Sequence, residues 1–528
     1  MEDFVKAFFI SNPRFWILLL LLLVVLFGCV KVVYSVWWRP KWLENQLKQQ
    51  GIEGAPYKLL HGYMKDYVRL LTEACSKPMN LNHQIAPRVL PFIYQTVQQY
   101  GKICYTWLGT APRLIISDPE LFRLVFTDKS YQFQKPPLNP LVDLLQLGLS
   151  TLEGDKWAGR RKMISPAFHQ NKLKGMVPAF TVSCNNLIER WKKLVSPQGS
   201  CELDVWPDLS NFSSDAISRA AFGSSYEEGK RIFELQKEQA LLVLEAYQSL
   251  YFPGLRFIPT KKNRRRYSLD NEIKRMLRDM IHQKRHAMIT GESSSDNLLG
   301  LMLQCSDLID TQVNVKNLSN DQMTIEDLIE ECKLFYFAGQ ETTAVWLAWT
   351  MIVLAMHQDW QEKAREEVLQ ICGKRTPDMD AISHLRLVTM ILNEVQRLYP
   401  PVVNLFRYTH KKTKLRDISL PAGIELYFPT YLMHHDPDIW GEDAQEFRPE
   451  RFSEGFSKAS KDQVAFYPFG WGPRFCLGQG FAAIEAKMAL AMILQHFSFK
   501  LSPTYAHAPY TVITLQPQHG AQLILHQL

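Results

Sequence analysis

Residues Phe469–Gly478 read Phe-Gly-Trp-Gly-Pro-Arg-Phe-Cys-Leu-Gly and place one cysteine in a turn rich in glycine. Glycine adopts backbone conformations that other residues avoid, so the turn can wrap its amide groups closely around the sulfur. We expect a helix to begin near Gly480, and its positive end favours the thiolate of Cys476 by about 0.3–1 kcal/mol. Arg474 adds a positive charge two residues away. The turn is therefore predicted to hold a metal-bound thiolate.

The cysteine spacing argues against a structural zinc ion as that metal. Such a site takes four Cys or His ligands at short spacing, and the chain has no Cys-x-x-Cys pair. A lone cysteine is more often a small buried hydrophobe than a ligand. A cofactor that brings the remaining ligands itself suits this turn better.

The same turn resembles the haem-binding loop of the cytochrome P-450 superfamily, Phe-x-x-Gly-x-Arg-x-Cys-x-Gly. It matches at every defined position, which are Phe469, Gly472, Arg474, Cys476 and Gly478. The resemblance implies haem b as the cofactor and the Cys476 thiolate as the proximal ligand of its iron. It also implies that Phe469 and Arg474 contact the haem.

A second motif lies in a long apolar run. Thr324-Ile325-Glu326-Asp327 is a capping box with Asp in place of Glu, and no proline follows it before His357. These signals predict one long buried helix from Thr324 to about His357. In its middle, Ala338–Thr343 reads Ala-Gly-Gln-Glu-Thr-Thr, a composition that is typical of a helix kink when it stands alone.

This hexapeptide also resembles the oxygen-activation motif of the cytochrome P-450 superfamily. The resemblance implies that Thr342 hydrogen-bonds dioxygen at the haem and that Glu341 helps to deliver protons from solvent. Both residues are therefore candidate catalytic residues.

Haem carries two propionates, whose natural partners are charge-assisted donors. Trp157 and Arg161 match the Trp-x-x-x-Arg helix motif of the superfamily, and Arg407 follows the Pro400-Pro401 pair at the expected distance. The resemblance implies that these residues, with Arg474, bind the cofactor.

A second helix is predicted from about 383 to 398, because Pro400-Pro401 disfavours helical geometry just beyond it. Glu394 and Arg397 lie one turn apart on this helix, a spacing that usually marks a solvated ion pair. They also match the Glu-x-x-Arg motif of the superfamily. The resemblance implies a buried structural network with an arginine of Phe447–Phe452.

The N-terminal apolar run from Phe15 to Val30 is uninterrupted and continues past Lys31 to Trp38, which is long enough to span a bilayer. It is too long for the competing interpretation, a cleaved signal peptide. The basic residues that follow it predict a cytosolic catalytic domain. We expect a membrane anchor at 1–38, a linker at 39–56 in which Pro40 and the Gly51–Pro56 stretch break the helix, and a catalytic domain at 57–528.

The chain has 528 residues, of which 46% are hydrophobic, enough for one large globular unit. Helical signals dominate, with short strands expected near the C terminus. The resemblance implies a mainly α fold with small β-sheets, the triangular helical prism of cytochrome P-450. The linker sequence around Trp38–Glu44 resembles the plant seventy-two clan of that superfamily, which implies retention in the endoplasmic reticulum membrane as a single-pass protein.

The formal net charge of +7 includes two basic runs, Lys261–Arg266 and Arg160–Lys162. No nucleic-acid motif accompanies them, so we expect no nucleic-acid partner. The first run is interpreted as a solvated face near anionic lipid. The second is interpreted, by analogy with the family, as a patch that steers an acidic flavin reductase.

The resemblance also predicts a largely apolar substrate cavity, which suits a lipophilic terpenoid, hormone-like molecule or fatty acid. Its expected walls are Leu138–Ser150, Leu241–Phe257, Phe335 and Phe337, Val402–Phe406 and Thr511–Leu515. The implied activity is a haem-thiolate monooxygenase that inserts one atom of O2 into a C–H bond. The electrons come from a flavin-containing reductase that uses NADPH. The alternatives are a haem-thiolate isomerase or lyase of hydroperoxides and a non-catalytic haem protein that binds ligands at the membrane.

Overall fold

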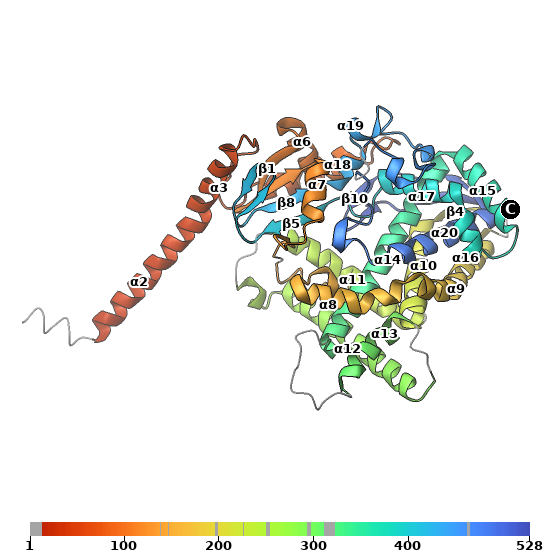
Figure 1. The fold of residues 1–528 in the computed structure, drawn as a ribbon, viewed down its shortest axis with the longest axis horizontal. Coiled ribbons are helices and arrows are strands. Elements are labelled where there is room, and N and C mark those ends of the chain that lie inside the picture. The colour runs from red at the N-terminus through yellow and green to blue at the C-terminus, as the bar shows by residue number, and fades with distance from the viewer. Residues whose placement is uncertain are drawn as a thin grey trace, which may run out of the picture.

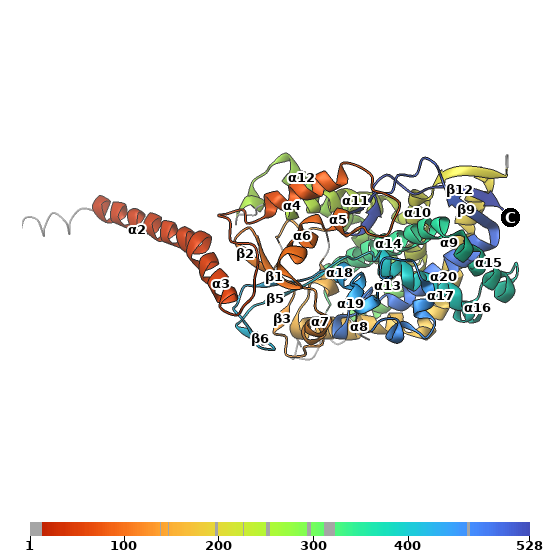
Figure 2. The ribbon, with the colours of Figure 1, turned by 90° about the horizontal axis from the view of Figure 1, so that it is seen from above.

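The computed structural model describes residues 13–528 except 138, 146, 196–198, 225, 250–253, 293–296, 311–322 and 462–464. A single helix projects from a broad globule, and the long helix α14 (Ile325–Met356) runs through the middle of that globule (Figures 1 and 2). Helices make up most of the chain and the sheets are small. The expected mainly α fold is confirmed.

Apart from α14, the described part of the chain contains a series of further helices, all of which except α2 bury residues in the globule. They are α2 (Pro13–Val33), α3 (Arg39–Lys48), α4 (Met64–Cys75), α5 (Ala86–Val89), α6 (Pro91–Tyr100), α7 (Pro119–Phe126), α8 (Gly154–Ile164), α9 (Gln170–Val195), α10 (Val205–Ile217), α11 (Tyr226–Tyr247), α12 (Lys261–Ile289), α13 (Leu298–Asp310), α15 (Gln358–Cys372), α16 (Met379–His384), α17 (Arg386–Leu398), α18 (Thr430–His434), α19 (Pro437–Trp440) and α20 (Gln479–His496). Short 3-10 or π segments are η1 (Tyr34–Trp38), η2 (Gly148–Ser150), η3 (Ser165–Phe168), η4 (Ser218–Phe222), η5 (Leu255–Phe257), η6 (Pro449–Phe452), η7 (Phe456–Lys458) and η8 (Gly472–Arg474).

Helix α14 begins with the predicted capping box. The Thr324 hydroxyl accepts from the Asp327 N–H at 3.1 Å, and the Asp327 carboxylate accepts from the Thr324 N–H at 2.9 Å. The helix ends at Met356, as predicted, and its second half is buried on every side. It packs against α10, α12, α17 and α20, so it forms the centre of the core.

A five-stranded sheet lies at the end of the globule next to the projecting helix (Figure 1). Its order is β1 (Ile103–Leu108), β2 (Ala111–Ile116), β8 (Glu425–Phe428), β5 (Leu405–Thr409) and β3 (Phe133–Gln134). Only β2 and β8 pair in parallel, with Leu114 opposite Leu426, and the other neighbours are antiparallel.

The predicted C-terminal strands are present at the opposite end of the globule (Figure 2). There, β12 (Gln522–Gln527) lies between β4 (Ser200–Asp204) and β9 (Phe497–Leu501). Two separate hairpins are formed by β10 (Pro509–Thr511) with β11 (Leu515–Pro517), and by β6 (Thr413–Leu415) with β7 (Ile418–Leu420).

The expected break at Pro40 is wrong, because α2, the π turn η1 and α3 form one continuous helix from the membrane segment into the globule. Pro40 has no N–H for the carbonyl of Val36 four residues earlier. That carbonyl accepts instead from the Tyr57 hydroxyl at 2.6 Å, so no buried acceptor is left unpaired. The helix ends only at Lys48, before Gly51 with φ +74°.

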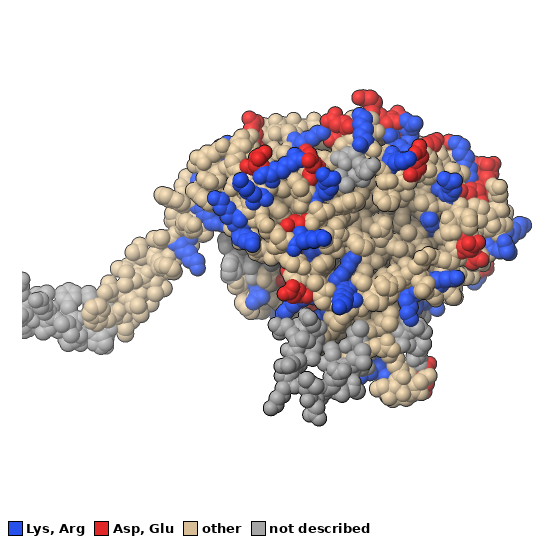
Figure 3. Space-filling model, viewed as in Figure 1, with Lys and Arg blue, Asp and Glu red and all other residues tan. Residues whose placement is uncertain are grey.

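Among the described residues, this helix is the only one long and apolar enough to cross a membrane. Figure 3 shows its outer part nearly free of charged residues, whereas acidic and basic residues are interspersed over the visible face of the globule. The domain division at residues 38 and 56 stays a prediction. The α3 segment nevertheless already buries Leu43 and Leu47 in the globule.

The second predicted helix is split at Leu385 into α16 and α17. No side chain near the start of α17 caps it. Glu367 from α15 does so instead, because its carboxylate accepts the N–H groups of Arg386, Leu387 and Val388 at 2.8–3.0 Å. The predicted end at Leu398 is confirmed.

Candidate active site

One cavity of about 410 Å³ lies between α14, α20 and the turn that contains Cys476. Nearly all of the candidate site residues line it, although they come from segments far apart in the sequence. These are Trp157, Arg161, Thr342, Arg407, Phe469, Arg474 and Cys476. Glu341 does not line this cavity.

The cysteine turn is held by its own backbone. The Cys476 N–H donates to the Phe469 carbonyl at 2.8 Å, and helix α20 begins at Gln479, close to the predicted start. Gly472 has φ +70°, and a side chain there would collide with the backbone carbonyl of Phe126 in α7. The turn therefore needs glycine at this position both for its conformation and for its packing.

Burial raises the pKa of the Cys476 thiol, whereas the Gly478 N–H and the positive charge of Arg161 oppose that shift. The expectation that the positive charge of Arg474 favours the Cys476 thiolate is wrong, because its guanidinium points to the Leu152 carbonyl and the Glu153 carboxylate. A metal ion is the stronger means of keeping such a thiol ionised.

Arg161 lies beside the turn on α8. It donates to the Phe475 carbonyl at 2.9 Å, and its guanidinium lies 4.7 Å from the centre of the Phe475 ring. Arg474 makes a similar contact with Trp157, at 4.4 Å from the ring centre. These contacts hold the cations at the cavity wall.

A cluster of positive charge forms one side of the cavity. Burial lowers the pKa of Arg407 to about 10, and the neighbouring charge of Arg474 adds to that shift. Burial also lowers the pKa of Lys135 to about 7, with Arg407 and Arg474 as further causes. Glu153 is the carboxylate that partly offsets this charge, and no acidic side chain is among the described residues that line the cavity.

This donor set fits haem. Two propionates would supply negative charge to Lys135 and Arg407, whereas Arg474 already pairs with Glu153, and Cys476 lines the same cavity. The rest of the wall is mostly apolar, as a porphyrin ring requires.

The hexapeptide of α14 faces two ways. Gly339, Thr342 and Thr343 line the cavity that contains Cys476, and the Thr342 hydroxyl donates to the Ala338 carbonyl at 2.7 Å. Glu341 accepts a hydrogen bond from Thr514 at 2.7 Å and another from Gln516. Its carboxylate is therefore held on another side of the helix from Thr342.

The predicted substrate walls are only partly correct. Leu149, Ser150, Phe335, Val402 and Leu405 line the cavity. The segments around Leu241 and Thr511, together with Phe337, do not line it, because they lie on the other side of α14. Leu138, Gln146 and residues 250–253 lie outside the described part of the chain.

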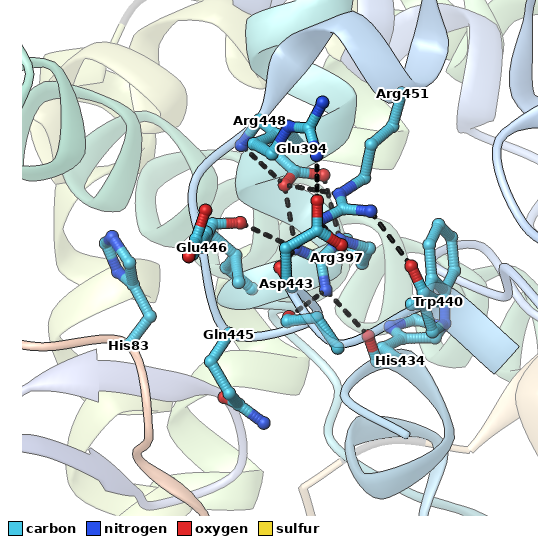
Figure 4. Close-up of polar contacts among 12 residues, drawn as sticks. His83, Glu394, Arg397, His434, Trp440, Asp443, Gln445, Glu446, Arg448 and Arg451 are labelled. Carbon is cyan, nitrogen blue, oxygen red and sulfur yellow. Dashed lines mark hydrogen bonds and ion pairs between the residues drawn. The ribbon is translucent and has the colours of Figure 1, made fainter. Parts of the chain in front are cut away.

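The Glu-x-x-Arg pair forms the buried network that the motif implies (Figure 4). Arg397 binds Glu394 through two nitrogen–oxygen contacts of 2.7 and 2.8 Å. Its remaining donors reach the carbonyls of His434, Ala444 and Glu446. Both arginines of the Phe447–Phe452 segment join the network. Arg451 lies 3.6 Å from Glu394 and pairs with Asp443, and the Arg448 N–H donates to Glu394 at 2.9 Å.

Lys135 is a charged cavity residue that the sequence did not indicate. It follows the short strand β3, and nothing in its neighbourhood separates it from the other 59 Lys and Arg residues, out of 60 in the chain. Gln396, between Glu394 and Arg397, also lines the cavity.

Comparison with known proteins agrees with this geometry. A model of the cytochrome P-450 family matches residues 80–523. The chain belongs to the cytochrome P-450 family. Membership of this family accounts for the long helix α14, for the turn that contains Cys476 and for the cavity between them.

Several curated plant P-450 proteins are similar over nearly the full length. CYP72A616 of Paris polyphylla is 53% identical over 494 residues, which cover 93% of this chain and 95% of the relative. Cytochrome P-450 72A15 of Arabidopsis thaliana is 51% identical over 494 residues, with the same two coverages. A 7-deoxyloganic acid hydroxylase of Catharanthus roseus is 48% identical over 522 residues, which cover 98% and 99%. The expected relationship to the plant seventy-two clan is confirmed.

As a cytochrome P-450, the chain is a haem b monooxygenase that acts on a small molecule with O2 and a redox partner. Electrons reach proteins of this family from NADPH through a reductase. Of the two basic runs, Lys261–Arg266 forms the first turns of α12, where Lys262 and Arg265 pair with acids of α11. The expectation for Arg160 in the second run is wrong, because Arg160 is buried against Glu331, while Lys162 is exposed.

Proposed function

We propose that this P-450 is anchored in the endoplasmic reticulum membrane and hydroxylates a C–H bond of a lipophilic, terpenoid-like molecule. The observation that carries the proposal is one cavity that is lined by Cys476, by Thr342 and by the cations Lys135, Arg407 and Arg474, and whose remaining wall is mostly apolar. The relative that is named a 7-deoxyloganic acid hydroxylase supports the hydroxylation of a small molecule. Hormone-like molecules and fatty acids are the competing substrate classes.

In this proposal, Cys476 would supply the thiolate ligand of the haem iron, and Phe469 would contact the haem. Trp157, Arg161, Arg407, Arg474 and Lys135 would hold the propionates. The bound haem supplies the redox chemistry that activates O2. The chain positions the haem, excludes water with apolar walls, and supplies protons.

Thr342 and Glu341 supply those protons. Thr342 lines the haem cavity, and its hydroxyl, which donates to the Ala338 carbonyl in this structure, would instead donate to dioxygen during the reaction. Glu341 would replace the donated proton from solvent. A cavity without such a relay would release peroxide instead of product. The presence of Thr342 at the cavity wall also favours a monooxygenase. An isomerase or lyase of hydroperoxides uses no O2 and so needs no residue that donates protons to it.

For the partner, we propose an NADPH-dependent flavin reductase that docks near Lys162, an exposed residue of α8. The α2 segment contacts membrane lipid and keeps the catalytic domain in the cytosol. Reversal of charge at Lys162 should raise the reductase concentration needed for turnover.

The test uses the full-length protein in microsomes with an NADPH reductase. We expect a reduced carbon-monoxide difference band at the long wavelength of thiolate ligation, and its loss in Cys476→Ala. With a panel of terpenoid acids, products should carry one oxygen atom from labelled O2. A normal thiolate band in Cys476→Ala would refute the ligand assignment, and turnover of fatty acids alone would refute the substrate class.

A further inference from the structure

Helix α14 separates the haem cavity from a second cavity of about 310 Å³. Thr342 and Thr343 line the haem cavity, whereas Gln340 and Glu341 line the second one. Successive residues of an α-helix point about 100° apart. The acid and the hydroxyls of one short motif therefore face two different cavities, and no described residue lines both.

The second cavity differs from the haem cavity in polarity. It lies between α10, α11, α14 and the β10–β11 hairpin, and several of its side chains are polar or charged. These include Ser210, Asn211, Glu234, Lys237, Tyr510 and Gln516. A polar cavity of this size admits water molecules.

Glu341 is held in the second cavity by two neutral donors. The Thr514 hydroxyl and the Gln516 side-chain amide both donate to the same carboxylate oxygen, the former at 2.7 Å. Within the part of the chain that the structure describes, Glu341 makes no ion pair.

Both donors belong to a hairpin that is fixed to α14. The Trp349 indole donates to the Leu515 carbonyl at 2.6 Å, and the Leu515 N–H donates to the Pro401 carbonyl at 3.0 Å. Thr514 itself is buried. The two donors therefore have a defined position relative to the helix that carries Glu341.

We propose that Thr514 and Gln516 are positioning residues for proton delivery, and that the second cavity is the side from which protons enter. The inference rests on the proposed role of Glu341. Water in the second cavity protonates the Glu341 carboxylate, which passes this proton to the Thr342 oxygen. The Thr342 hydroxyl gives its own proton to the acceptor in the haem cavity. One proton is transferred from solvent, and no electron moves in these steps.

The neutral character of the two donors matters for this relay. A carboxylate leaves two neutral hydrogen bonds more readily than it leaves a buried ion pair. Thr514 and Gln516 can thus hold Glu341 where it meets water and still release it toward Thr342.

The test compares Thr514→Val and Gln516→Leu with wild type in the full-length, haem-loaded protein. Each variant removes one donor at nearly constant volume. We expect the fraction of NADPH electrons that ends in peroxide to rise about tenfold, and the solvent isotope effect on product formation to increase. A readout independent of turnover is the infrared band of the Glu341 carboxyl group, identified by its absence in Glu341→Gln. This band should shift in both variants.

Two further variants make the test specific. Thr514→Ser keeps the hydroxyl donor and should restore wild-type coupling. Thr511→Val is the matched control, because the Thr511 hydroxyl lies buried in the same hairpin without a hydrogen-bond partner. It should leave the coupling and the carboxyl band unchanged.

The outcomes separate the inference from the proposed function. If Glu341→Gln uncouples the enzyme but Thr514→Val and Gln516→Leu change neither coupling nor the carboxyl band, the positioning role is refuted and the function of Glu341 stands. If Glu341→Gln leaves coupling intact, the positioning role of Thr514 and Gln516 and the proposed proton-delivery role of Glu341 are both refuted. If Thr514→Val does not load haem, Gln516→Leu decides alone, since it contributes the second donor.

Discussion

The carboxylate of Glu394 and the guanidinium of Arg397 form a two-point ion pair in which both side chains are fully buried. The pair sits at the end of α17, and its other donors and acceptors are backbone groups of the segment that leads to the haem loop. It therefore ties α17 to that segment.

Removal of one partner should be severe. Glu394→Ala leaves an uncompensated guanidinium in the core and should lower the free energy of unfolding by about 3–5 kcal/mol. Urea unfolding followed by circular dichroism measures the change. Glu454→Ala, in the exposed pair with Lys458, is the control and should change stability by less than about 0.5 kcal/mol. Equal effects would show that burial of the first pair is energetically unimportant.

The glycines of the haem loop offer a matched steric comparison. Gly472 and Gly470 both have positive φ, at +70° and +75°. Gly470→Ala meets no atom within 4 Å and should cost only the backbone conformation, about 1–2 kcal/mol. Gly472→Ala also collides with the Phe126 carbonyl and should lose most haem incorporation. Thermal unfolding and the carbon-monoxide band check this, and equal losses would contradict it.

A buried acid predicts how stability depends on pH. Glu485 of α20 is fully buried, and burial raises the pKa of its carboxyl group well above the usual value, partly opposed by the hydroxyls of Ser213 and Thr343. Between the ordinary carboxyl pKa and this raised pKa, the folded protein therefore binds one more proton than the unfolded chain. Stability should fall as pH rises, by about 1.4 kcal/mol per unit. Glu485→Gln should remove this slope, and an unchanged slope in thermal or urea unfolding would contradict the prediction.

Lys135 predicts a pH dependence of haem retention. Its pKa is lowered to about 7 without haem, and the propionates should raise it, so haem binding takes up a proton above that pH. Haem affinity should therefore decrease as pH rises from about 7, and Lys135→Met should flatten the dependence. Transfer of haem to an excess of a scavenger measures it. Lys156→Met, at an exposed position of α8, should behave as wild type; a flat profile in wild type would contradict the assignment.

The sequence predicted those parts of the site in which a motif contains its own chemical requirement. The cysteine turn needs glycine and an adjacent helix start, and the capping box closes its hydrogen bonds within four residues. The Glu394–Arg397 pair is likewise one helical turn apart. Such signals are local, so the long central helix and the turn were predictable from the residues themselves. The burial of the Glu394–Arg397 pair was implied only by the resemblance to the superfamily, because its other partners are distant in sequence.

The remaining features depend on partners that are distant in sequence. The helix continues through Pro40 because Tyr57 satisfies a carbonyl, and α17 begins where Glu367 of another helix caps it. The direction in which Glu341 faces depends on Thr514, far along the chain. No local pattern carries this information, because each depends on which side chain the completed fold brings near.

The unbroken helix from α2 through η1 into α3 makes the anchor a rigid extension of the globule. A flexible linker would leave the orientation of the globule on a bilayer undefined. A continuous helix couples the tilt and rotation of the anchor to the globule through the buried Leu43 and Leu47. One inserted residue near Tyr34 would turn the outer part by about 100° and lift it by about 1.5 Å. Each such insertion would therefore change the orientation of the catalytic globule relative to the bilayer.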